Sequence, residues 1–204
     1  MESILVIGTG NRKKGLELAA LLADSGWTIR TLADFPDPIE PEETGETFAE
    51  NAAIKASAQA THLGQWVLAD DSGLCVDALH GGPGVHSARF AGEPCDNAAN
   101  NALLLEKLGK LPMERRGAQF VCAMALADPS GAVRARASGA VHGRIRYALD
   151  GVHGFGYDPL FEIPEYHRTF GVLPAVVKSI LSHRAAAARQ ILPELRRLRH
   201  ERIR

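Results

Sequence analysis

The 204-residue sequence lacks several features that would assign it to a special class of protein. Its 23 Lys and Arg balance 24 Asp and Glu, so it has no charge excess that would attract nucleic acid or an anionic membrane. Three cysteines, Cys75, Cys95 and Cys122, are too few and too widely spaced for a disulfide framework or a zinc site. No apolar run is long enough to span a bilayer, and the N-terminus lacks the basic and long apolar segments of a signal peptide. These absences predict a soluble, cytoplasmic protein with reduced thiols, and neither nucleic acid nor membrane as partner.

Hydrophobic residues make up 46% of the chain, which is sufficient for a substantial core. The length suits one large domain or one domain with two lobes. We find no internal repeat, low-complexity linker or clear boundary. The sequence therefore predicts a single domain over residues 1–204.

Strands and helices alternate in the first half of the chain, and a hairpin follows later. Strands are expected at 3–8, 27–32 and 66–69, in a hairpin over 117–127 and 132–143, and after the turn at 154–161. Helices are expected at 11–25, 47–62 and 96–108, and from near Ser182 onward. Thr47 and Glu50 form a capping-box pattern, and "DPSG" is a turn signal for the hairpin. The order predicts an α/β protein with a mixed sheet.

The segment "LADDSGLCVD" places two carboxylates, Asp70 and Asp71, directly after a buried apolar run. Ser72-Gly73 suits a turn, so we expect the strand to end on the two charges. Buried carboxylates are costly without a partner, and carboxylate oxygens are ligands that Mg²⁺ prefers. A metal would also keep one aspartate ionised as a base towards water. The alternative is that Asp70 is a turn or cap residue and Asp71 a surface charge.

"GTGNRKK", residues 8–14, is a glycine-containing turn between a strand and a helix. Backbone N–H groups at a helix N-terminus suit phosphate, and Lys14 adds a cation. The segment is neither a Walker loop nor a dinucleotide fingerprint. The alternative is an ordinary turn in which Asn11 caps the helix.

"EETGETFAENAAIKA" contains an acidic pair and a helix start. Glu42 and Glu43 could cap the helix, remain solvated or bind a metal ion. Asn51 and Lys55 are four residues apart, so they share a helical face and could present an amide and an ammonium to one ligand. A solvated face is the commoner explanation of such a pair.

Two later segments carry aromatic and basic residues. In "GFGYDP", an exposed aromatic ring could stack on a base and Asp158 could accept a base N–H. The alternative is that Phe155 and Tyr157 are both core residues, and for Tyr157 this alternative is favoured. In "KSILSHR", three cations have no acidic neighbour in the sequence and favour an anionic or electron-rich ligand. A helix cap or a buried core position is the alternative for His183. The arginines after residue 195 alternate with leucines, which is typical of a solvated helix face.

In order and spacing, these segments resemble the non-standard purine nucleoside triphosphate pyrophosphatases, also called inosine/xanthosine triphosphatases. The resemblance runs from residue 4 to about residue 190. It is carried by "TGNRKK", "EETGETFAENAAIKA", "ADDSGL", "GGPGVHSARFAG", "GFGYDPLF" and "SHR" followed by a helix.

The resemblance implies an elongated mixed β-sheet flanked by helices, with two lobes and an active cleft between them, usually in a homodimer. The implied activity is Mg²⁺-dependent hydrolysis of ITP, dITP and XTP to the monophosphate and pyrophosphate. One region departs from the family pattern, because Val172 and Val176-Val177 stand where relatives usually have acidic residues. This departure puts the geometry around Lys178 in doubt.

The resemblance also implies a role for individual residues. Asp71 is the metal-linked general base and Glu42 a further metal ligand. The expected triphosphate contacts come from the glycine turn and the following helix: Thr9, Gly10, Asn11, Arg12, Lys13, Lys14 and Lys55. The expected contacts to the rest of the nucleotide are Ser72, Phe155, Gly156, Tyr157, Asp158, Lys178, His183 and Arg184, with Phe155 stacking on the base.

Two other functions remain open from the sequence. One is a catalytically silent nucleotide-binding module, and the other is a pyrophosphatase for a modified pyrimidine or methylated nucleotide. Arg184 offers only hydrogen-bond donors, which suits the 6-oxo acceptor of inosine and xanthosine. The "SHR" and "GFGYD" segments therefore favour a 6-oxo purine.

Overall fold

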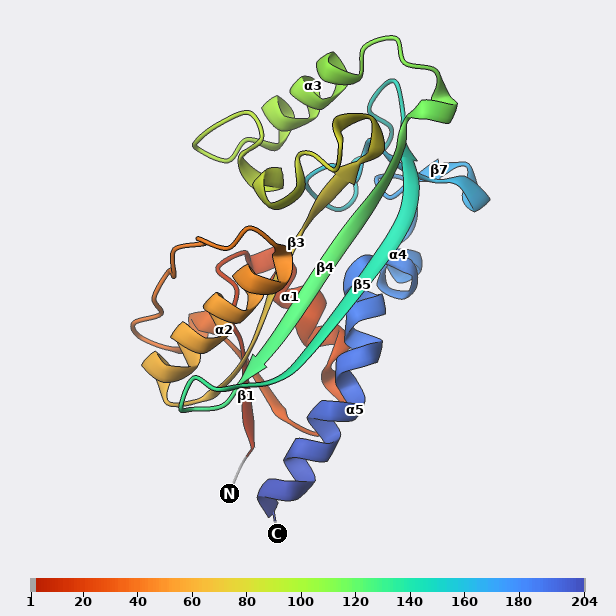
Figure 1. Ribbon diagram of the computed structural model, residues 1–204. Coiled ribbons are helices and arrows are strands. Elements are labelled where there is room, and N and C mark those ends of the chain that lie inside the picture. The colour runs from red at the N-terminus through yellow and green to blue at the C-terminus, as the bar shows by residue number, and fades with distance from the viewer. Residues whose placement is uncertain (1–2, 204) are drawn as a thin grey trace. The chain divides into compact units, whose positions relative to one another are not determined.

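The computed structural model describes residues 3–203, in which helices flank a mixed sheet of seven strands (Figure 1). The strand order is β2-β1-β3-β4-β5-β6-β7. The strands are β1 Ile4–Ile7, β2 Thr28–Thr31, β3 Trp66–Val76, β4 Gly117–Ala127, β5 Val133–Ile145, β6 Phe161–Ile163 and β7 Arg168–Thr169. The helices are α1 Arg12–Leu21, α2 Phe48–Leu63, α3 Asn97–Leu108, α4 Ala175–Leu181 and α5 His183–Ile203. The predicted α/β class is confirmed.

The chain divides into two compact units. The first unit comprises Met1–Asp71, Cys122–Gly139 and His183–Arg204, and the second comprises Ser72–Val121 and Ala140–Ser182. Each unit is therefore built from segments that are distant in the sequence. The prediction of one domain over 1–204, with a cleft between two lobes, stays a prediction.

In the first unit, β1 pairs in parallel with β2 and β3, and successive residues of each strand pack on opposite faces of the sheet. One core contains Leu5, Ile7, Trp66, Leu68, Cys122, Met124 and Leu126, packed with α1 and α5 residues that include Leu18, Ala187 and Ile191. The other core contains Val6, Val67, Ala69, Ala123, Ala125 and Ala127, packed with Ala52, Ala56 and Ala60 of α2. Alanines on both sides of the second core allow α2 to lie close to the sheet.

The helix starts and the hairpin agree with the sequence pattern. Thr47 caps α2 by accepting from the Glu50 amide at 3.2 Å, and the Glu50 carboxylate accepts from the Thr47 amide at 3.0 Å. Asp96 caps α3 by accepting from the amides of Ala98 at 2.8 Å and Ala99 at 3.2 Å. The hairpin of β4 and β5 closes through the turn between Asp128 and Ala132. Local hydrogen-bonding residues thus determine where these elements begin.

The expected end of the third strand at Asp70 is wrong, because β3 runs without interruption from Trp66 to Val76. Ser72-Gly73 lies within the strand rather than in a turn. A strand can carry two carboxylates through the interior only if each meets a cation, and both aspartates of β3 do so.

The second unit has its own core, formed by the later half of β3, the first half of β4, the end of β5, α3 and β6, together with Tyr157, Leu160, Phe170 and Leu173. Three of its phenylalanine rings pack together, with 4.5 Å between the centroids of Phe120 and Phe161 and 5.6 Å between those of Phe161 and Phe170. β6 pairs antiparallel with both β5 and β7. This packing fixes the ends of the "GFGYDPLF" segment.

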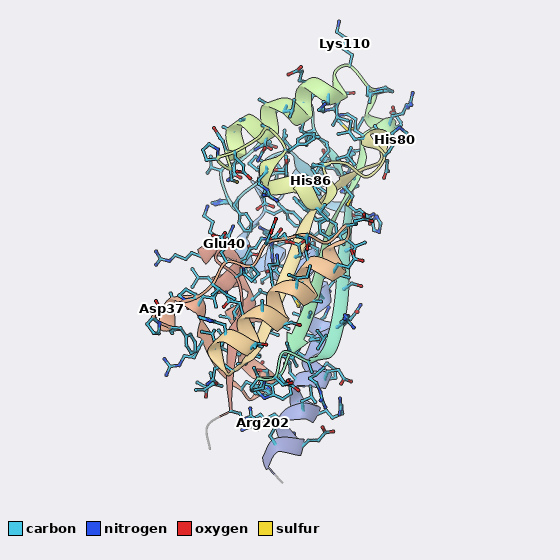
Figure 2. All side chains as sticks on the ribbon, turned by 60° about the vertical axis from the view of Figure 1, so that its left-hand side comes forward. Asp37, Glu40, His80, His86, Lys110 and Arg202 are labelled. Carbon is cyan, nitrogen blue, oxygen red and sulfur yellow. The ribbon has the colours of Figure 1, made fainter. Side chains whose placement is uncertain are left out.

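The basic residues of α5 have partners both within the helix and elsewhere in the first unit. Arg197 pairs with Glu194 at 2.8 Å and with Glu201 at 2.6 Å. The Arg202 guanidinium, labelled in Figure 2, lies 5.4 Å from the centroid of the Trp27 ring.

Among residues 3–203, no helix is both long and apolar enough to cross a membrane.

Candidate active site

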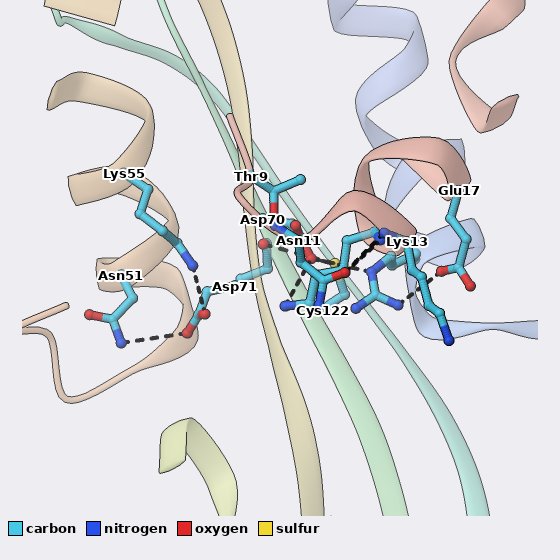
Figure 3. A network of polar contacts seen from close by, with 12 residues as sticks. Thr9, Asn11, Lys13, Glu17, Asn51, Lys55, Asp70, Asp71 and Cys122 are labelled. Atoms are coloured by element: carbon cyan, nitrogen blue, oxygen red, sulfur yellow. Dashed lines mark hydrogen bonds and ion pairs between the residues drawn. The ribbon is translucent and has the colours of Figure 1, made fainter. Parts of the chain in front are cut away.

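The two adjacent aspartates of β3 lie on opposite faces of the sheet. Asp70 continues the series Trp66 and Leu68, which faces α1 and α5, whereas Asp71 continues Val67 and Ala69, which faces α2. Asp70 is 1% exposed and Asp71 is 6% exposed. Each buried carboxylate therefore needs a partner from a different helix, as Figure 3 shows.

Asp70 is held by cations from both helices on its face. Its Oδ2 lies 3.3 Å from Nε of Arg184 and 3.9 Å from Nζ of Lys14. Arg184, itself buried, also donates through Nη1 to Glu17 at 3.0 Å. Burial alone would raise the pKa of Asp70, but the positive charges of Lys14 and Arg184 outweigh it and hold that pKa below its usual value. The Cys122 thiol, 4.0 Å from Asp70, has its pKa raised by burial and stays protonated.

Asp71 meets two donors from consecutive turns of α2. Nζ of Lys55 lies 2.8 Å from Oδ1 of Asp71, and Nδ2 of Asn51 lies 3.5 Å from Oδ2. Lys55 also reaches Oε1 of Glu43 at 3.1 Å, so one ammonium joins two carboxylates. Burial raises the pKa of Asp71 and outweighs the opposing attraction of Lys55. A carboxylate with a raised pKa is a stronger base towards water.

The glycine turn forms the start of α1. Asn11 is the helix cap, since its Oδ1 accepts from the amides of Lys13 at 3.0 Å and Lys14 at 3.2 Å. Thr9 accepts from the Asn11 amide at 3.3 Å. The capping alternative for Asn11 is therefore observed, and Lys14 is the residue of this turn that reaches the aspartates.

The cluster fits a magnesium ion by the chemistry of its donors. Within residues 3–203, no three His, Cys, Asp or Glu side chains form a closed metal cage. Mg²⁺ commonly uses one or two protein carboxylates and takes its other ligands from water and substrate phosphates. Asp71 and Glu43 already surround one cationic group, Nζ of Lys55. Glu42 is exposed, and its neighbour Glu43 is the residue that reaches Lys55.

In the second unit, Asp158 organises the "GFGYDP" turn. Its Oδ2 accepts from the Phe155 amide at 2.7 Å and from Nζ of Lys178 at 2.6 Å. The same ammonium lies 4.6 Å from the centroid of the Phe155 ring. Asp158 is 2% exposed and Lys178 is 8% exposed, so this ion pair is buried.

Tyr157 and Gly156 connect this turn to the rest of the second unit. The Tyr157 hydroxyl donates to the Ser87 carbonyl at 2.8 Å, and its ring is in the core, as the structural alternative predicted. Nδ2 of Asn101 donates to the Gly156 carbonyl at 3.0 Å. The turn is thus held at three successive residues.

The fold agrees with comparisons to known proteins. The sequence model of the Ham1 family matches residues 5–194. This chain belongs to the Ham1 family.

Relatives of this Ham1 family member are similar over nearly their whole length. A dITP/XTP pyrophosphatase of Rhodopirellula baltica is 54% identical over 95% of this chain and 93% of its own. A dITP/XTP pyrophosphatase of Desulforamulus reducens is 49% identical over 95% and 96% of the two chains. The solved structure of the Staphylococcus aureus Ham1 protein has a TM-score of 0.83 and 38% identity, covering 94% of this chain and 97% of that one. The resemblance found from the sequence motifs is confirmed.

In this Ham1 family chain, the predicted site residues fall into two groups. The first unit contains Thr9, Gly10, Asn11, Arg12, Lys13, Lys14, Glu42, Lys55, Asp71, His183 and Arg184, and the second contains Ser72, Phe155, Gly156, Tyr157, Asp158 and Lys178. Lys178 and Arg184 have no acidic neighbour in the sequence, but the fold brings carboxylates to both. Lys178 pairs with Asp158, and Arg184 with Asp70 and Glu17.

Sequence reasoning left Glu17 and Asn101 out of the site, and it offered ligand binding by Asn51 and metal binding by Glu43 only as open possibilities. Glu17 lies one turn after Lys14 on α1, which is the spacing of neighbours on a helix face. The contacts of Glu17 and Asn101 are made to residues 167 and 55 positions away. No local signal could have identified those partners.

The departures from the family pattern leave the Lys178 contacts in place. Val176 is exposed on α4, Val177 packs against the second core, and Val172 is half-buried. Lys178 nevertheless remains buried and paired with Asp158. The three valines therefore leave the ion pair between Lys178 and Asp158 intact.

Replacing Asp70 with asparagine is expected to lower the free energy of unfolding by about 3–5 kcal/mol at pH 7, because Arg184 would lose a buried negative partner. Since the pKa of Asp70 is lowered in the folded state, its contribution is present above the usual carboxyl pKa and is lost as pH falls through the folded value. Urea denaturation from pH 7 down to pH 3 would measure this difference. The exposed Glu46→Gln is the control and should change stability by no more than about 0.5 kcal/mol. Equal stability of Asp70→Asn and wild type at pH 7 would contradict the assignment.

Proposed function

We propose that this protein hydrolyses the non-standard purine nucleoside triphosphates ITP, dITP and XTP to the monophosphate and pyrophosphate. The observation that carries the proposal is the buried Asp71, which meets Lys55 and Asn51 of α2 and is adjacent in the chain to Asp70, whose carboxylate faces Lys14 of α1. The relatives named dITP/XTP pyrophosphatase, similar over more than nine-tenths of this chain, support the same substrates. Removal of such nucleotides cleanses the nucleotide pool.

Asp71 is the general base of the proposed reaction. It takes a proton from water as the water oxygen bonds to the α-phosphorus, and the bond from that phosphorus to the bridging oxygen breaks to release pyrophosphate. The raised pKa that burial gives Asp71 favours this role. Because Lys55 already touches Asp71, it is placed to neutralise charge on the reacting phosphate.

Mg²⁺ is the proposed cofactor, with Asp71 and Glu42 as its protein ligands and Glu43 beside them. When bound, the ion would supply Lewis-acid polarisation of the phosphates and of the attacking water. Lys14 and the turn from Thr9 to Lys14 are proposed to bind the triphosphate, since a helix N-terminus and a cation both favour anions. Arg12 and Lys13 add exposed positive charge to the same turn.

Phe155 is proposed to stack on the base. Lys178 lies over the Phe155 ring and pairs with Asp158, which favours a role for these three residues in shaping the base site. Ser72, His183 and Arg184 are the remaining proposed nucleotide contacts. Two donors of Arg184 already bind the carboxylates of Asp70 and Glu17. We therefore expect Arg184 to affect recognition of the purine 6-oxo group together with these two residues.

The decisive experiment is a substrate panel with the purified protein and Mg²⁺, measuring released pyrophosphate. ITP, dITP and XTP should be hydrolysed with kcat/KM far above that for GTP or ATP. For ATP the ratio should reach about 10⁴, because its 6-amino donor would leave buried donors unpaired. Binding without turnover would favour the silent nucleotide-binding module. Preference for a modified pyrimidine would favour the other pyrophosphatase.

Asp71→Asn should lower kcat for ITP by about 10²–10⁴, the usual contribution of a general base, with the fold intact by circular dichroism. Asp77→Asn is the matched control, since Asp77 is exposed and follows the same strand. It should leave kcat unchanged. Near wild-type turnover of Asp71→Asn at saturating Mg²⁺ would remove Asp71 from the role of base.

We also propose that the protein is a homodimer that acts in the cytoplasm. Three free thiols, Cys75, Cys95 and Cys122, fit a reducing compartment. Val176 and Ile180 are one helical turn apart on α4 and are 65% and 59% exposed. Large apolar side chains exposed together favour a protein contact.

Ile180→Glu is therefore expected to convert a dimer into a monomer, because a charge would be buried at the contact. Light scattering after size exclusion would measure the mass. Leu16→Glu is the control, since Leu16 is equally exposed but lies on α1 of the first unit. A dimeric mass for Ile180→Glu would show that α4 is not the contact.

A further inference from the structure

Asn51 links two parts of the first unit that carry carboxylates. It lies on α2, one turn before Lys55, and is 2% exposed. Its Oδ1 accepts from the Gly45 amide at 2.8 Å, and its Nδ2 lies 3.5 Å from Oδ2 of Asp71 (Figure 3). One amide group thus binds both the loop that carries Glu43 and the carboxylate on β3.

The contact with the loop depends on close approach of its backbone. A Cβ atom at Gly45 would lie 2.6 Å from Oδ1 of Asn51 and 2.7 Å from Cβ of Glu50. Only glycine allows the chain to pass so near to α2 at this point. Earlier in the same loop, the His62 ring contacts the Asp37 carbonyl and the buried Gln59 side chain donates to the Ile39 carbonyl. Helix α2 therefore holds the loop at several points.

The two donors on Asp71 differ in what they can do. Lys55 binds Oδ1 and is shared with Glu43, so an incoming triphosphate competes with the two carboxylates for Lys55, and a metal ion competes with Lys55 for the carboxylates. Asn51 is neutral and enclosed, and its hydrogen bond to the loop fixes the amide so that Nδ2 faces Oδ2. An aspartate could keep the bond to Gly45 but could not donate, and an apolar residue could do neither.

We propose that Asn51 is a positioning residue, which holds the acidic loop and the Asp71 carboxylate in one arrangement before metal and substrate bind. This inference rests on the proposed function only for the role of Asp71 as base. Loss of alignment at a reacting group commonly costs about 100-fold in rate. Asn51 would therefore affect turnover without touching the substrate.

Three measurements on the variants Asn51→Asp and Asn51→Leu distinguish the role of the Asn51 acceptor, Oδ1, from that of its donor, Nδ2. Exchange of the Gly45 amide with solvent, followed by NMR, should stay slow in Asn51→Asp and increase at least about tenfold in Asn51→Leu, because only leucine removes the acceptor. Mn²⁺ titrated calorimetrically, without nucleotide, should bind more weakly to Asn51→Leu only. With ITP, kcat should fall about 10- to 100-fold in both variants, with KM changed less than about threefold.

Asn100→Asp is the matched control for a buried asparagine. Asn100 is also 2% exposed and closes a loop by accepting from the Ala91 amide at 2.7 Å and donating to the Ala88 carbonyl at 2.9 Å. Neither of these two partners is a carboxylate. The kcat of the Asn100→Asp variant should therefore stay within about twofold of wild type, while the melting temperature of the variant falls.

If the Gly45 amide exchanges as slowly in Asn51→Leu as in wild type, Asn51 does not hold the acidic loop. If Asn51→Asp has the kcat of wild type, Asn51 does not position the Asp71 carboxylate. A fall in kcat for Asn100→Asp equal to that for Asn51→Asp would show a general loss of stability instead. If wild-type protein hydrolyses no nucleotide of the panel, the proposed function fails. In that case the Gly45 exchange and the Mn²⁺ titration still decide whether Asn51 holds the loop and the carboxylate together.

Discussion

The site depends on one constraint: β3 carries two ionised groups through the interior of a sheet. Side chains of a strand alternate between its faces, so Asp70 and Asp71 point to opposite sides although they are adjacent in the chain. An unpaired carboxylate in either position would be prohibitively costly. Each face therefore needs a cation from a helix packed against it. The positions of α1, α2 and α5 are thus constrained by the two adjacent carboxylates, Asp70 and Asp71.

The two faces solve this problem in different ways. Arg184 and Lys14 both lie against Oδ2 of Asp70, and their positive charges lower its pKa in spite of burial, which keeps it ionised and makes it part of the framework. On the other face, burial dominates at Asp71 and its pKa is raised. Two carboxyl groups with different environments can take different roles, one structural and one reactive. This separation is the physical basis for assigning the proposed base to Asp71.

The second unit uses the same principle on a smaller scale. Asp158 would be an isolated buried charge without Lys178, and the ion pair brings an ammonium against the Phe155 ring. Asp158 also accepts from the Phe155 amide, so it shapes the turn as well as neutralising the cation. One carboxylate thus serves both the backbone of the turn and the charge of Lys178. Both units thus hold their polar side chains by buried charge pairs.

The sequence alone determined the α/β class, the capped starts of α2 and α3, and the hairpin, because caps and turns depend on residues within about five positions. It also identified the family, since the motifs keep their order and spacing. Only the tertiary structure decided that β3 continues past Asp71, that Glu43 rather than Glu42 reaches Lys55, and that Arg184 binds Asp70 and Glu17. The Arg184 contacts join residues more than a hundred positions apart, and all three outcomes depend on the balance between burial and ion pairing. No local pattern encodes that balance.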